Sequence, residues 1–388
     1  MMKHFFLIVL VAVPVSLFAQ HTVTIEVIGQ PVAHQEEAFF ITGSFNRWSV
    51  AEPAMKMLAD KNYRIEIKNV RDSFLLEYKF NRGSWQTLES TKEGRLVAPR
   101  SAIITKDTTI ACVIEGWRDD FPASTASAQV HVMDTAFFIP QLNRYRRVWI
   151  YLPADYKTSN KKYPVLYMHD GQDLFDEATS EGRIGPLEWG VDEVIDASPR
   201  KCIVVGIDHD PDKKIRIEEY FVNTNPDQAK ADGAKYLDFI VNTLKPHIDK
   251  QYRTQPDKRH TFLAGSSMGG LITFYGGLLY PDVFGSLGVL SPSIWLDHEN
   301  IYKQLNDLKQ KKSIQKQRYY FYAGDNENRA KPTGGFVQMH VDVNAATAVL
   351  QKNFNPQIKK TITPGGRHGA WHWRIAFPAF YEWLTKDL

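Results

Sequence analysis

Cysteine is almost absent from this chain of 388 residues, which contains only Cys112 and Cys202. The two stand far apart, and each lies within an apolar stretch of the kind that forms a strand. A buried free cysteine behaves as a small apolar side chain. We therefore expect two buried thiols rather than a disulfide bond between them.

Net charge is also small, because 47 lysines and arginines nearly balance 44 aspartates and glutamates and leave a formal charge of +3. No dense basic block stands beside stacking aromatic residues, so nucleic acid is not an expected partner. With 43% hydrophobic and 23% charged residues, the chain has the composition of one that buries a full core. Its length favours two domains.

Ligand patterns for metal ions are lacking too. His169, Asp170, Asp173 and Asp176 gather in one short segment, but their spacing follows no recognised metal-ligand pattern. We therefore expect neither a metal ion nor another cofactor.

Long apolar runs are confined to the start of the chain. A short basic segment precedes an apolar core over residues 5–18, and the small Ala19 follows directly before Gln20. This is the pattern of a signal peptide, so we expect residues 1–19 to be removed and the mature protein to be periplasmic or extracellular. No later apolar run is long enough to span a bilayer, and integral membrane association is not expected.

Residues 20–115 consist almost entirely of short stretches in which apolar and polar residues alternate. Such stretches are typical of half-buried antiparallel strands, and their spacing predicts a small all-β sandwich domain. The expected strands are 23–27, 38–42, 63–67, 74–80 and 108–114. The following residues, 116–129, read as a linker because much of that stretch lacks large side chains.

From residue 130 to 388, continuous apolar stretches alternate with helical ones. That order predicts an α/β domain with a mostly parallel central sheet, covered by helices on both faces. The expected strands are 148–152, 164–168, 202–207, 262–264, 287–290, 319–323 and 358–362. Active sites of such sheets lie at the carboxyl ends of the strands, so the residues after each strand are the first candidates.

One strand end carries the pattern Gly265-Ser266-Ser267-Met268-Gly269, and a helical stretch follows it. This is the arrangement of the GxSxG nucleophile elbow, in which small residues flank a serine at a strained turn. Ser267 is therefore the expected nucleophile.

A serine hydroxyl needs a base and a group that orients the base. In α/β-hydrolases the acid and then the histidine follow the serine in the chain. His368 lies on a glycine-rich loop after a strand, whereas His372 looks helical, so we favour His368 as the base. Asp325 and Glu327 both follow the preceding strand, and either one could be the acid.

Acyl transfer also requires hydrogen-bond donors for the oxyanion that develops at the carbonyl. The amide of Met268, the residue after the nucleophile, is the first candidate. We expect the second donor to be Gly171 or Gln172, in the loop after strand 164–168, because glycine lets the backbone turn an amide toward the pocket.

Residues 130–388 resemble the esterase D, or enterochelin esterase-like, branch of the α/β-hydrolases, which includes carbohydrate esterases of family 1. Besides the elbow, the resemblance rests on segments 169–175, 189–192, 216–220, 244–246, 280–284 and 291–295, and on His368 with Trp373. In that family the acid often stands fourth from a glycine that ends the strand, which implies Glu327. The resemblance also implies Trp295 as a substrate-binding residue.

The first region has a resemblance of its own. Its segments 42–48, 77–80 and 83–89 are similar to the starch- and glycogen-binding modules of families 20 and 48. In those modules two tryptophans form a platform on which a sugar stacks, and the resemblance implies Trp48 and Trp85.

Together these features predict a secreted or periplasmic serine esterase that hydrolyses acetyl or feruloyl esters on carbohydrate, with Ser267, His368 and Glu327 as its triad. Three alternatives stay open. They are a hydrolase of siderophore esters, an enzyme that transfers acyl groups to a sugar, and a carbohydrate-binding protein without catalytic activity.

Overall fold

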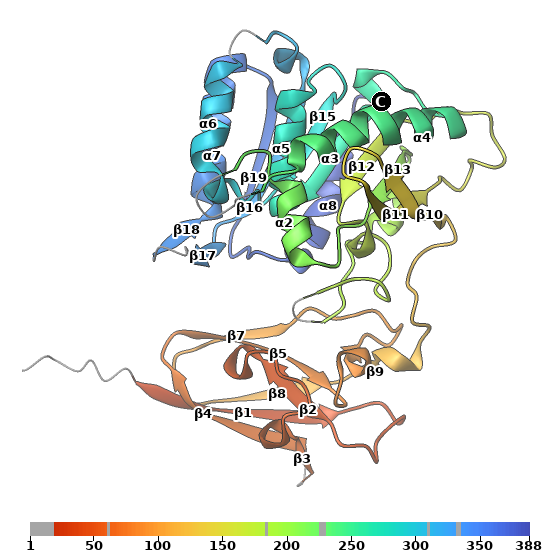
Figure 1. The fold of residues 1–388 in the computed structure, drawn as a ribbon. Helices are drawn as coiled ribbons and strands as arrows, with labels where there is room; N and C mark the ends of the chain where they lie inside the picture. The colour runs from red at the N-terminus through yellow and green to blue at the C-terminus, as the bar shows by residue number, and fades with distance from the viewer. Residues whose placement is uncertain (1–18, 60–62, 183–184, 225–229, 309–310, 331–334) are drawn as a thin grey trace, which may run out of the picture. The chain divides into compact units, whose positions relative to one another are not determined.

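The computed structural model describes residues 19–59, 63–182, 185–224, 230–308, 311–330 and 335–388. The chain forms two compact units, Met1–Pro122 and Ala123–Leu388 (Figure 1). The predicted signal peptide, residues 1–19, lies outside the described residues except for Ala19. The first described strand, β1, begins at Gln20.

The boundary between the units falls inside the predicted linker, but the linker begins later than expected. Gly116–Trp117 form a short strand, β9, that pairs with β6 (Glu89–Ser90) of the first unit. Trp117 is buried in the core of that unit, because burying a large aromatic side chain is strongly favourable. In the second unit, the amide of Thr125 donates to the carboxylate of Asp176 at 3.0 Å.

The first unit is built from strands in two main sheets, and all five expected strands form. One sheet has the order β3 (Leu58–Ala59), β4 (Tyr63–Arg71), β1 (Gln20–Gly29) and β8 (Thr108–Val113), and the other has β2 (Phe40–Gly43), β5 (Phe74–Asn81) and β7 (Arg100–Ile104). Both sheets contribute to one hydrophobic core, which contains Ile25 and Ile67 from the first sheet and Leu76 from the second.

The pairing of β1 differs from the antiparallel arrangement expected for these strands. β1 pairs antiparallel with β4 but parallel with β8. A parallel pair needs a long crossover connection, and the chain between β1 and β8 supplies it. Alternation along a strand reports which face is buried and not the direction of its neighbour, so the sequence pattern could not reveal this pair.

The second unit contains an eight-stranded sheet, and the expected mostly parallel α/β architecture is confirmed. Its order is β10 (Val130–Ile139), β11 (Arg144–Tyr151), β13 (Ile203–Ile207), β12 (Val165–His169), β14 (Thr261–Ser266), β15 (Ser286–Leu290), β16 (Arg318–Gly324) and β19 (Gln357–Thr363). The pairs formed by β11 are antiparallel, and the remaining pairs are parallel. All seven expected strands form.

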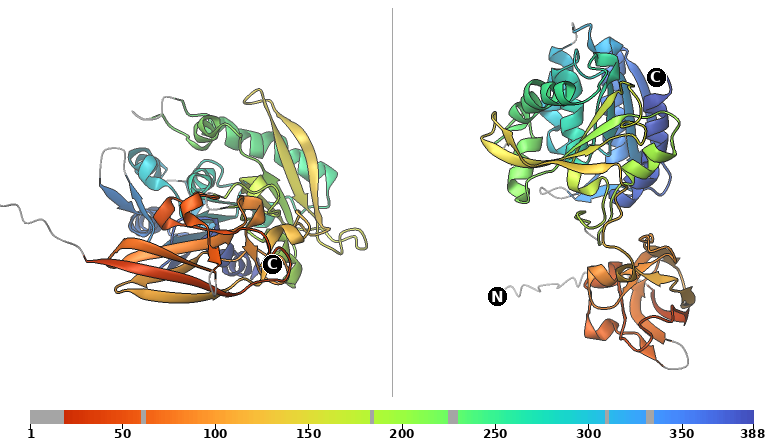
Figure 2. Two further views of the ribbon diagram at one scale, coloured as in Figure 1. Left: turned by 90° about the horizontal axis from the view of Figure 1, so that it is seen from below. Right: turned by 90° about the vertical axis from the view of Figure 1, so that its right-hand side faces the viewer.

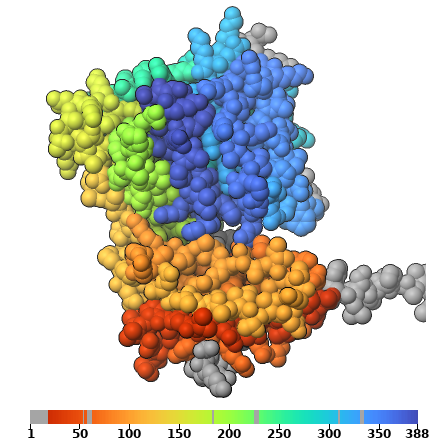
Figure 3. Space-filling view, turned by 180° about the vertical axis from the view of Figure 1, so that it is seen from behind, coloured from red at the N-terminus to blue at the C-terminus, as the bar shows by residue number. Residues whose placement is uncertain are grey.

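Helices cover both faces of this sheet, as Figures 1 and 2 show. They are α1 (Val191–Ala197), α2 (Lys213–Tyr220), α3 (Gly233–Phe239), α4 (Lys245–Gln251), α5 (Met268–Leu279), α6 (His298–Asp307), α7 (Met339–Phe354) and α8 (Ala370–Thr385). Apolar side chains of α1 and α8 pack on one face, and those of α3, α5, α6 and α7 pack on the other. Figure 3 shows the surface of the first face, where α8, in dark blue, lies beside α1, in light green.

The position of β12 determines where a site can form. β12 lies between β13 and β14, so the chain continues first to one side of it and later to the other. Loops that leave the carboxyl ends of strands at such a switch point open a crevice between them. The loop after β12 and the loop after β14 therefore face each other.

Two further expectations concern single features. Cys112 and Cys202 are free and buried, which confirms the prediction of two thiols. Within the described ranges, no helix is long and apolar enough to cross a membrane.

Candidate active site

Ser267 stands at the turn between β14 and α5, at the carboxyl end of a central strand. Its backbone angles, φ 56° and ψ −120°, lie in a region that residues other than glycine rarely adopt. Backbone hydrogen bonds hold this conformation. Ser267 N–H donates to Leu290 O at 3.0 Å, and Ser267 O accepts from Ser293 N–H at 2.9 Å and from Leu271 N–H at 3.0 Å. The turn has the strained geometry of a nucleophile elbow.

The glycines on both sides of Ser267 pack closely against other groups, Gly265 more tightly than Gly269. A Cβ at Gly265 would lie 2.6 Å from Gly269 O and 2.8 Å from Cδ2 of His169, which is closer than such atoms approach. A Cβ at Gly269 would meet a carboxylate oxygen of Asp170 at 3.1 Å. The missing side chains let α5 begin directly after the serine.

A continuous chain of hydrogen bonds links Ser267, His368 and Glu327. The Ser267 hydroxyl donates to Nε2 of His368 at 3.0 Å, and Nδ1–H of His368 donates to Oε2 of Glu327 at 2.8 Å. A carboxylate can only accept, so it selects the tautomer whose Nε2 lone pair faces the serine. The three residues follow three different strands, β14, β19 and β16. This arrangement can take the hydroxyl proton and hold the resulting imidazolium.

Of the two carboxylates after β16, the structure brings Glu327 to His368. Glu327 is 1% exposed, and its Oε1 accepts hydrogen bonds from the amide that ends β16 at 2.6 Å and from the Ser291 hydroxyl at 2.8 Å. Asp325 instead accepts a hydrogen bond at 2.7 Å from the amide of Gly365, on the loop that carries His368. One carboxylate orients the ring, and the other holds the loop.

Trp373 and Ser291 extend this network, and neither has a role in the sequence-based prediction. Nε1 of Trp373 donates to the Ser291 hydroxyl at 2.9 Å, and the Trp373 ring packs edge-on against His368 with 5.0 Å between ring centroids. His372, the alternative to His368, lies in the first turn of α8. These contacts join residues far apart in the chain, so no local pattern could have indicated them.

A second hydroxyl lies beside the candidate nucleophile. Oγ of Ser293 is 3.3 Å from Oγ of Ser267, within hydrogen-bonding distance. Sequence reasoning missed this residue as well. The Ser267 hydroxyl therefore has two neighbours, of which His368 is the one that can act as a base.

The predicted oxyanion donors lie at the starts of two helical segments. Met268 is the first residue of α5, and Gly171 and Gln172 open the 3-10 turn Gly171–Asp173. The first amides of a helix have no acceptor within the helix, which leaves them for an incoming oxygen. Gly171 packs on the backbone of β13, where a Cβ would lie 2.8 Å from the carbonyl carbon of Gly206.

The acidic and histidine residues of the loop after β12 are engaged with protein groups. Two hydrogen bonds of 2.9 Å join Asp170 to Arg216, and Nδ1 of His169 lies 2.9 Å from Tyr236 OH. Burial lowers the pKa of His169 to about 4, so its ring is neutral at physiological pH. Asp176 accepts hydrogen bonds from the start of the second unit. In the part of the chain that the structure describes, no cluster of such residues suits a metal ion.

The predicted substrate-binding tryptophans are half-buried and lie in different parts of the chain. Trp295 belongs to the 3-10 turn Ile294–Leu296, which begins directly after Ser293 of the site. Trp48 and Trp85 belong to short turns of the first unit. Only Trp295 is therefore carried by a loop that forms the candidate site.

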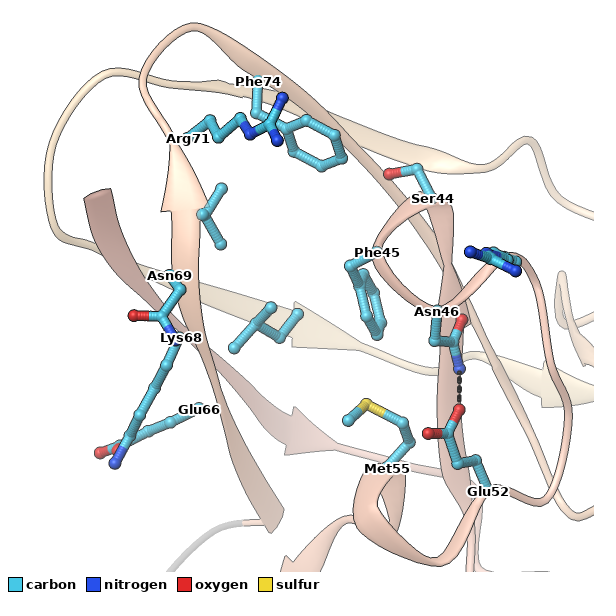
Figure 4. A pocket seen from close by; sticks show the side chains of 13 residues that line it. Ser44, Phe45, Asn46, Glu52, Met55, Glu66, Lys68, Asn69, Arg71 and Phe74 are labelled. Atoms are coloured by element: carbon cyan, nitrogen blue, oxygen red, sulfur yellow. Dashed lines mark hydrogen bonds and ion pairs between the residues drawn. The ribbon is translucent and has the colours of Figure 1, made fainter. Parts of the chain in front are cut away.

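The first unit carries an open groove with a cavity of about 600 Å³ (Figure 4). Strand β4 forms one side, and the two short turns around Phe45 and Met55 form the other. Its lining includes Phe74 but neither Trp48 nor Trp85. The predicted sugar platform and this groove are therefore different surfaces.

Two curated proteins are similar in sequence to this chain. The uncharacterized protein YbbA of Bacillus subtilis is 26% identical over 251 residues, which cover 62% of this chain and 92% of that protein. The endo-1,4-beta-xylanase/feruloyl esterase of Xylanibacter ruminicola is 25% identical over 206 residues, which cover 51% of this chain and 25% of that protein.

A solved structure and a family comparison agree with the fold. The enterobactin esterase of Shigella flexneri has a TM-score of 0.54 at 16% identity, and the alignment covers 91% of this chain and 89% of that one. The model of the Esterase family matches residues 139–384, most of the second unit. Because this match covers more than half of the sequence, the chain belongs to the Esterase family and is a carboxylic ester hydrolase.

Proposed function

We propose that the chain is a serine esterase that hydrolyses acetyl or feruloyl esters carried by carbohydrate. The observation that supports the catalytic part is the hydrogen-bond chain from Ser267 through His368 to Glu327, with distances of 3.0 and 2.8 Å. The substrate part is supported by the relative named a xylanase and feruloyl esterase, and by the glycan-module features of the first unit.

Ser267 attacks the ester carbonyl while Nε2 of His368 takes the hydroxyl proton. Glu327 accepts Nδ1–H throughout and stabilises the imidazolium. The tetrahedral intermediate collapses when the bond between the carbonyl carbon and the alcohol oxygen breaks, and His368 returns the proton to the leaving alcohol. Water then attacks the acyl-enzyme with the help of the same base, which releases the carboxylic acid and restores Ser267.

The amides of Met268 and of Gly171 or Gln172 donate to the carbonyl oxygen as it becomes negative. Met268 opens α5, whose N-terminal end carries a partial positive charge. Since the full negative charge exists only near the transition state, these bonds lower the barrier more than they tighten substrate binding.

A hydrolase of siderophore esters is the second candidate. The structural alignment with the enterobactin esterase covers 91% of this chain, which is more than the second unit alone. The same triad would open such an ester by the same steps. The predicted signal peptide favours the polysaccharide substrate, because plant polysaccharides lie outside the cell.

Export is part of the proposal. The apolar start of the chain supports it, and cell fractionation with N-terminal sequencing tests it. We expect a protein in the periplasm or medium that begins near Gln20. A cytoplasmic protein that still begins at Met1 would contradict export.

A small ester panel tests the proposed function. The purified protein should release acetate from acetylated xylan or ferulate from feruloylated arabinoxylan faster than it opens a cyclic catecholate ester. Ser267→Ala should lose hydrolysis of every ester in the panel. Equal rates for the two proteins would contradict the triad, and a preference for the catecholate ester would contradict the carbohydrate substrate.

Retention of Ser267→Ala on insoluble starch or xylan tests the first unit separately. If Trp48 and Trp85 form a sugar platform, replacing either with alanine should weaken retention about tenfold, because each ring supplies part of the stacking surface. Unchanged retention in both variants would rule out the platform.

Failure of a fluorophosphonate to label Ser267 in the parent protein would favour a binding protein without catalysis.

A further inference from the structure

Asp170 and Arg216 form a partly buried ion pair beside the candidate active site. Nε of Arg216 donates to Oδ1 of Asp170, and Nη2 donates to Oδ2, both at 2.9 Å. The Tyr220 hydroxyl adds a hydrogen bond to Oδ1 at 3.2 Å. Such a two-bond contact fixes the orientation of both groups as well as their distance.

This pair touches both segments that hold the predicted oxyanion donors. Asp170 immediately precedes the loop amides, and its Oδ2 would lie only 3.1 Å from a Cβ placed at Gly269 of the elbow. Nη1 of Arg216 lies 3.9 Å from Sδ of Met268. Arg216 itself comes from α2, a third element. One ion pair therefore connects the loop after β12, the elbow and α2.

The backbone of Asp170 determines the direction of the turn that follows. Its angles, φ 57° and ψ 50°, are left-handed, a conformation that aspartate adopts more readily than most residues other than glycine. Asp170 caps the turn that contains Gly171 and Gln172, so a rotation at Asp170 would redirect both amides. Burial alone would raise the pKa of Asp170, but Arg216 lowers it below the ordinary value, so the carboxylate stays ionised.

We propose that Asp170 and Arg216 are positioning residues that set the spacing between the two oxyanion donors. Arg216 acts on the loop amides through Asp170 and on the elbow through its contact with Met268. Neither side chain contacts the reacting atoms. This inference rests on the proposed acyl-enzyme mechanism.

Kinetics of Arg216 variants test the proposal. Arg216→Lys keeps the positive charge but cannot form two parallel bonds, and Arg216→Gln removes the charge. With p-nitrophenyl acetate, we expect kcat to fall about 10- to 100-fold in both variants, since a small displacement of catalytic donors has effects of this size. KM should change by less than about threefold, because the lost interaction belongs to the transition state.

A transition-state analogue provides a second readout. A trifluoromethyl ketone forms a tetrahedral adduct with Ser267 whose oxyanion needs the same donors. Its affinity should fall in the Arg216 variants by the same factor as kcat/KM. Asp170→Asn should reproduce the loss of Arg216→Gln, and the double variant should lose no more, because the two residues act as one unit.

Arg100→Gln is the matched control. Arg100 donates two hydrogen bonds, of 3.1 and 2.7 Å, to the buried carboxylate of Glu89 in the first unit. This control breaks an ion pair that also joins an arginine to a carboxylate and that belongs to the other unit. We expect it to lower thermal stability and leave kcat unchanged.

Three results would overturn the proposal. A raised KM with unchanged kcat would mean that Arg216 contacts substrate. A smaller fraction of sites titrated by fluorophosphonate, with normal kcat per titrated site, would mean a structural role only. Equal hydrolysis by the parent protein and Ser267→Ala would overturn the proposed function and this inference with it. If Arg216→Gln does not fold, Arg216→Lys carries the same test.

Discussion

Asp325 and Glu327 follow the same strand but have different partners around His368. Glu327 accepts the hydrogen bond of the ring, whereas Asp325 accepts that of the Gly365 amide. The chain order of serine, acid and histidine places the acid between the nucleophile and His368, and the rule that sites lie at the carboxyl ends of strands points to this loop. The family resemblance implies Glu327, and the path of the chain in space gives the physical reason, because Glu327 turns into a buried site beside Ser291.

Glu327→Gln tests this assignment. The substitution removes the charge that holds the imidazolium, so we expect kcat to fall about 10²- to 10⁴-fold, as for other triad acids. Asp325→Asn keeps an acceptor for Gly365 and should change kcat by less than about threefold. Steady-state kinetics on one ester measure both. A larger loss for Asp325→Asn would show that the acid is Asp325.

Single residues are predictable where a local motif carries them. The elbow marks Ser267, and the loops after the last two strands of the eight-stranded sheet, β16 and β19, mark the acid and the base. Ser291, Ser293 and Arg216 meet the site only through contacts between distant segments. The resemblance includes them in segments 216–220 and 291–295 but gives none of them a role, which only these contacts indicate.

At the scale of elements, buried strands are predictable and β10 is not. Six of the seven expected strands of the second unit are apolar runs inside the sheet, whereas β19 is an edge strand, which its β-branched isoleucine and threonine residues indicate. β10 (Val130–Ile139) is an outer strand with β11 as its neighbour, and it leaves side chains such as Val132 and Phe138 exposed. An edge strand has less surface to bury, so the continuous apolar signal is missing.

Alanine at the two glycines of the strand-to-helix turn should reduce stability to different degrees. A Cβ at Gly265 would lie 2.6 Å from a carbonyl oxygen, whereas the nearest atom to a Cβ at Gly269 is 3.1 Å away. We expect Gly265→Ala to lower the free energy of unfolding by about 2 kcal/mol or more, and Gly269→Ala by less. Denaturant unfolding measures both values. A smaller effect for Gly265→Ala would contradict the packing described for the elbow.

The stability of the protein should depend on pH through Asp173, in the turn after β12. Burial raises the pKa of Asp173 to about 7, whereas an unfolded aspartate titrates near 4. The folded state therefore binds this proton more tightly, and the associated stability is present at low pH and lost as the pH rises through 7.

Asp173→Asn stays neutral at every pH. The free energy of unfolding of this variant minus that of the parent protein should therefore be larger at pH 8 than at pH 5, by on the order of 2 kcal/mol. Urea unfolding at the two pH values measures the difference. The same difference at both values would show that Asp173 does not titrate in this range.

At the scale of the whole molecule, the two units differ in how much their sequences disclose. The second unit has a motif with a known chemistry, and its family match spans residues 139–384. The first unit has strands with alternating apolar and polar residues, a pattern that indicates a hydrophobic core but no catalytic activity. Binding measurements on Trp48, Trp85 and the separate groove are what would assign a ligand to this unit.

Ser267 should carry the acyl group as a covalent intermediate during ester hydrolysis. Mass spectrometry after acid quenching tests this, with p-nitrophenyl trimethylacetate as an ester whose bulky acyl group slows deacylation. We expect one trimethylacetyl group on the peptide that contains Ser267, and none in Ser267→Ala. An acyl group on another residue, or full hydrolysis by Ser267→Ala, would contradict it.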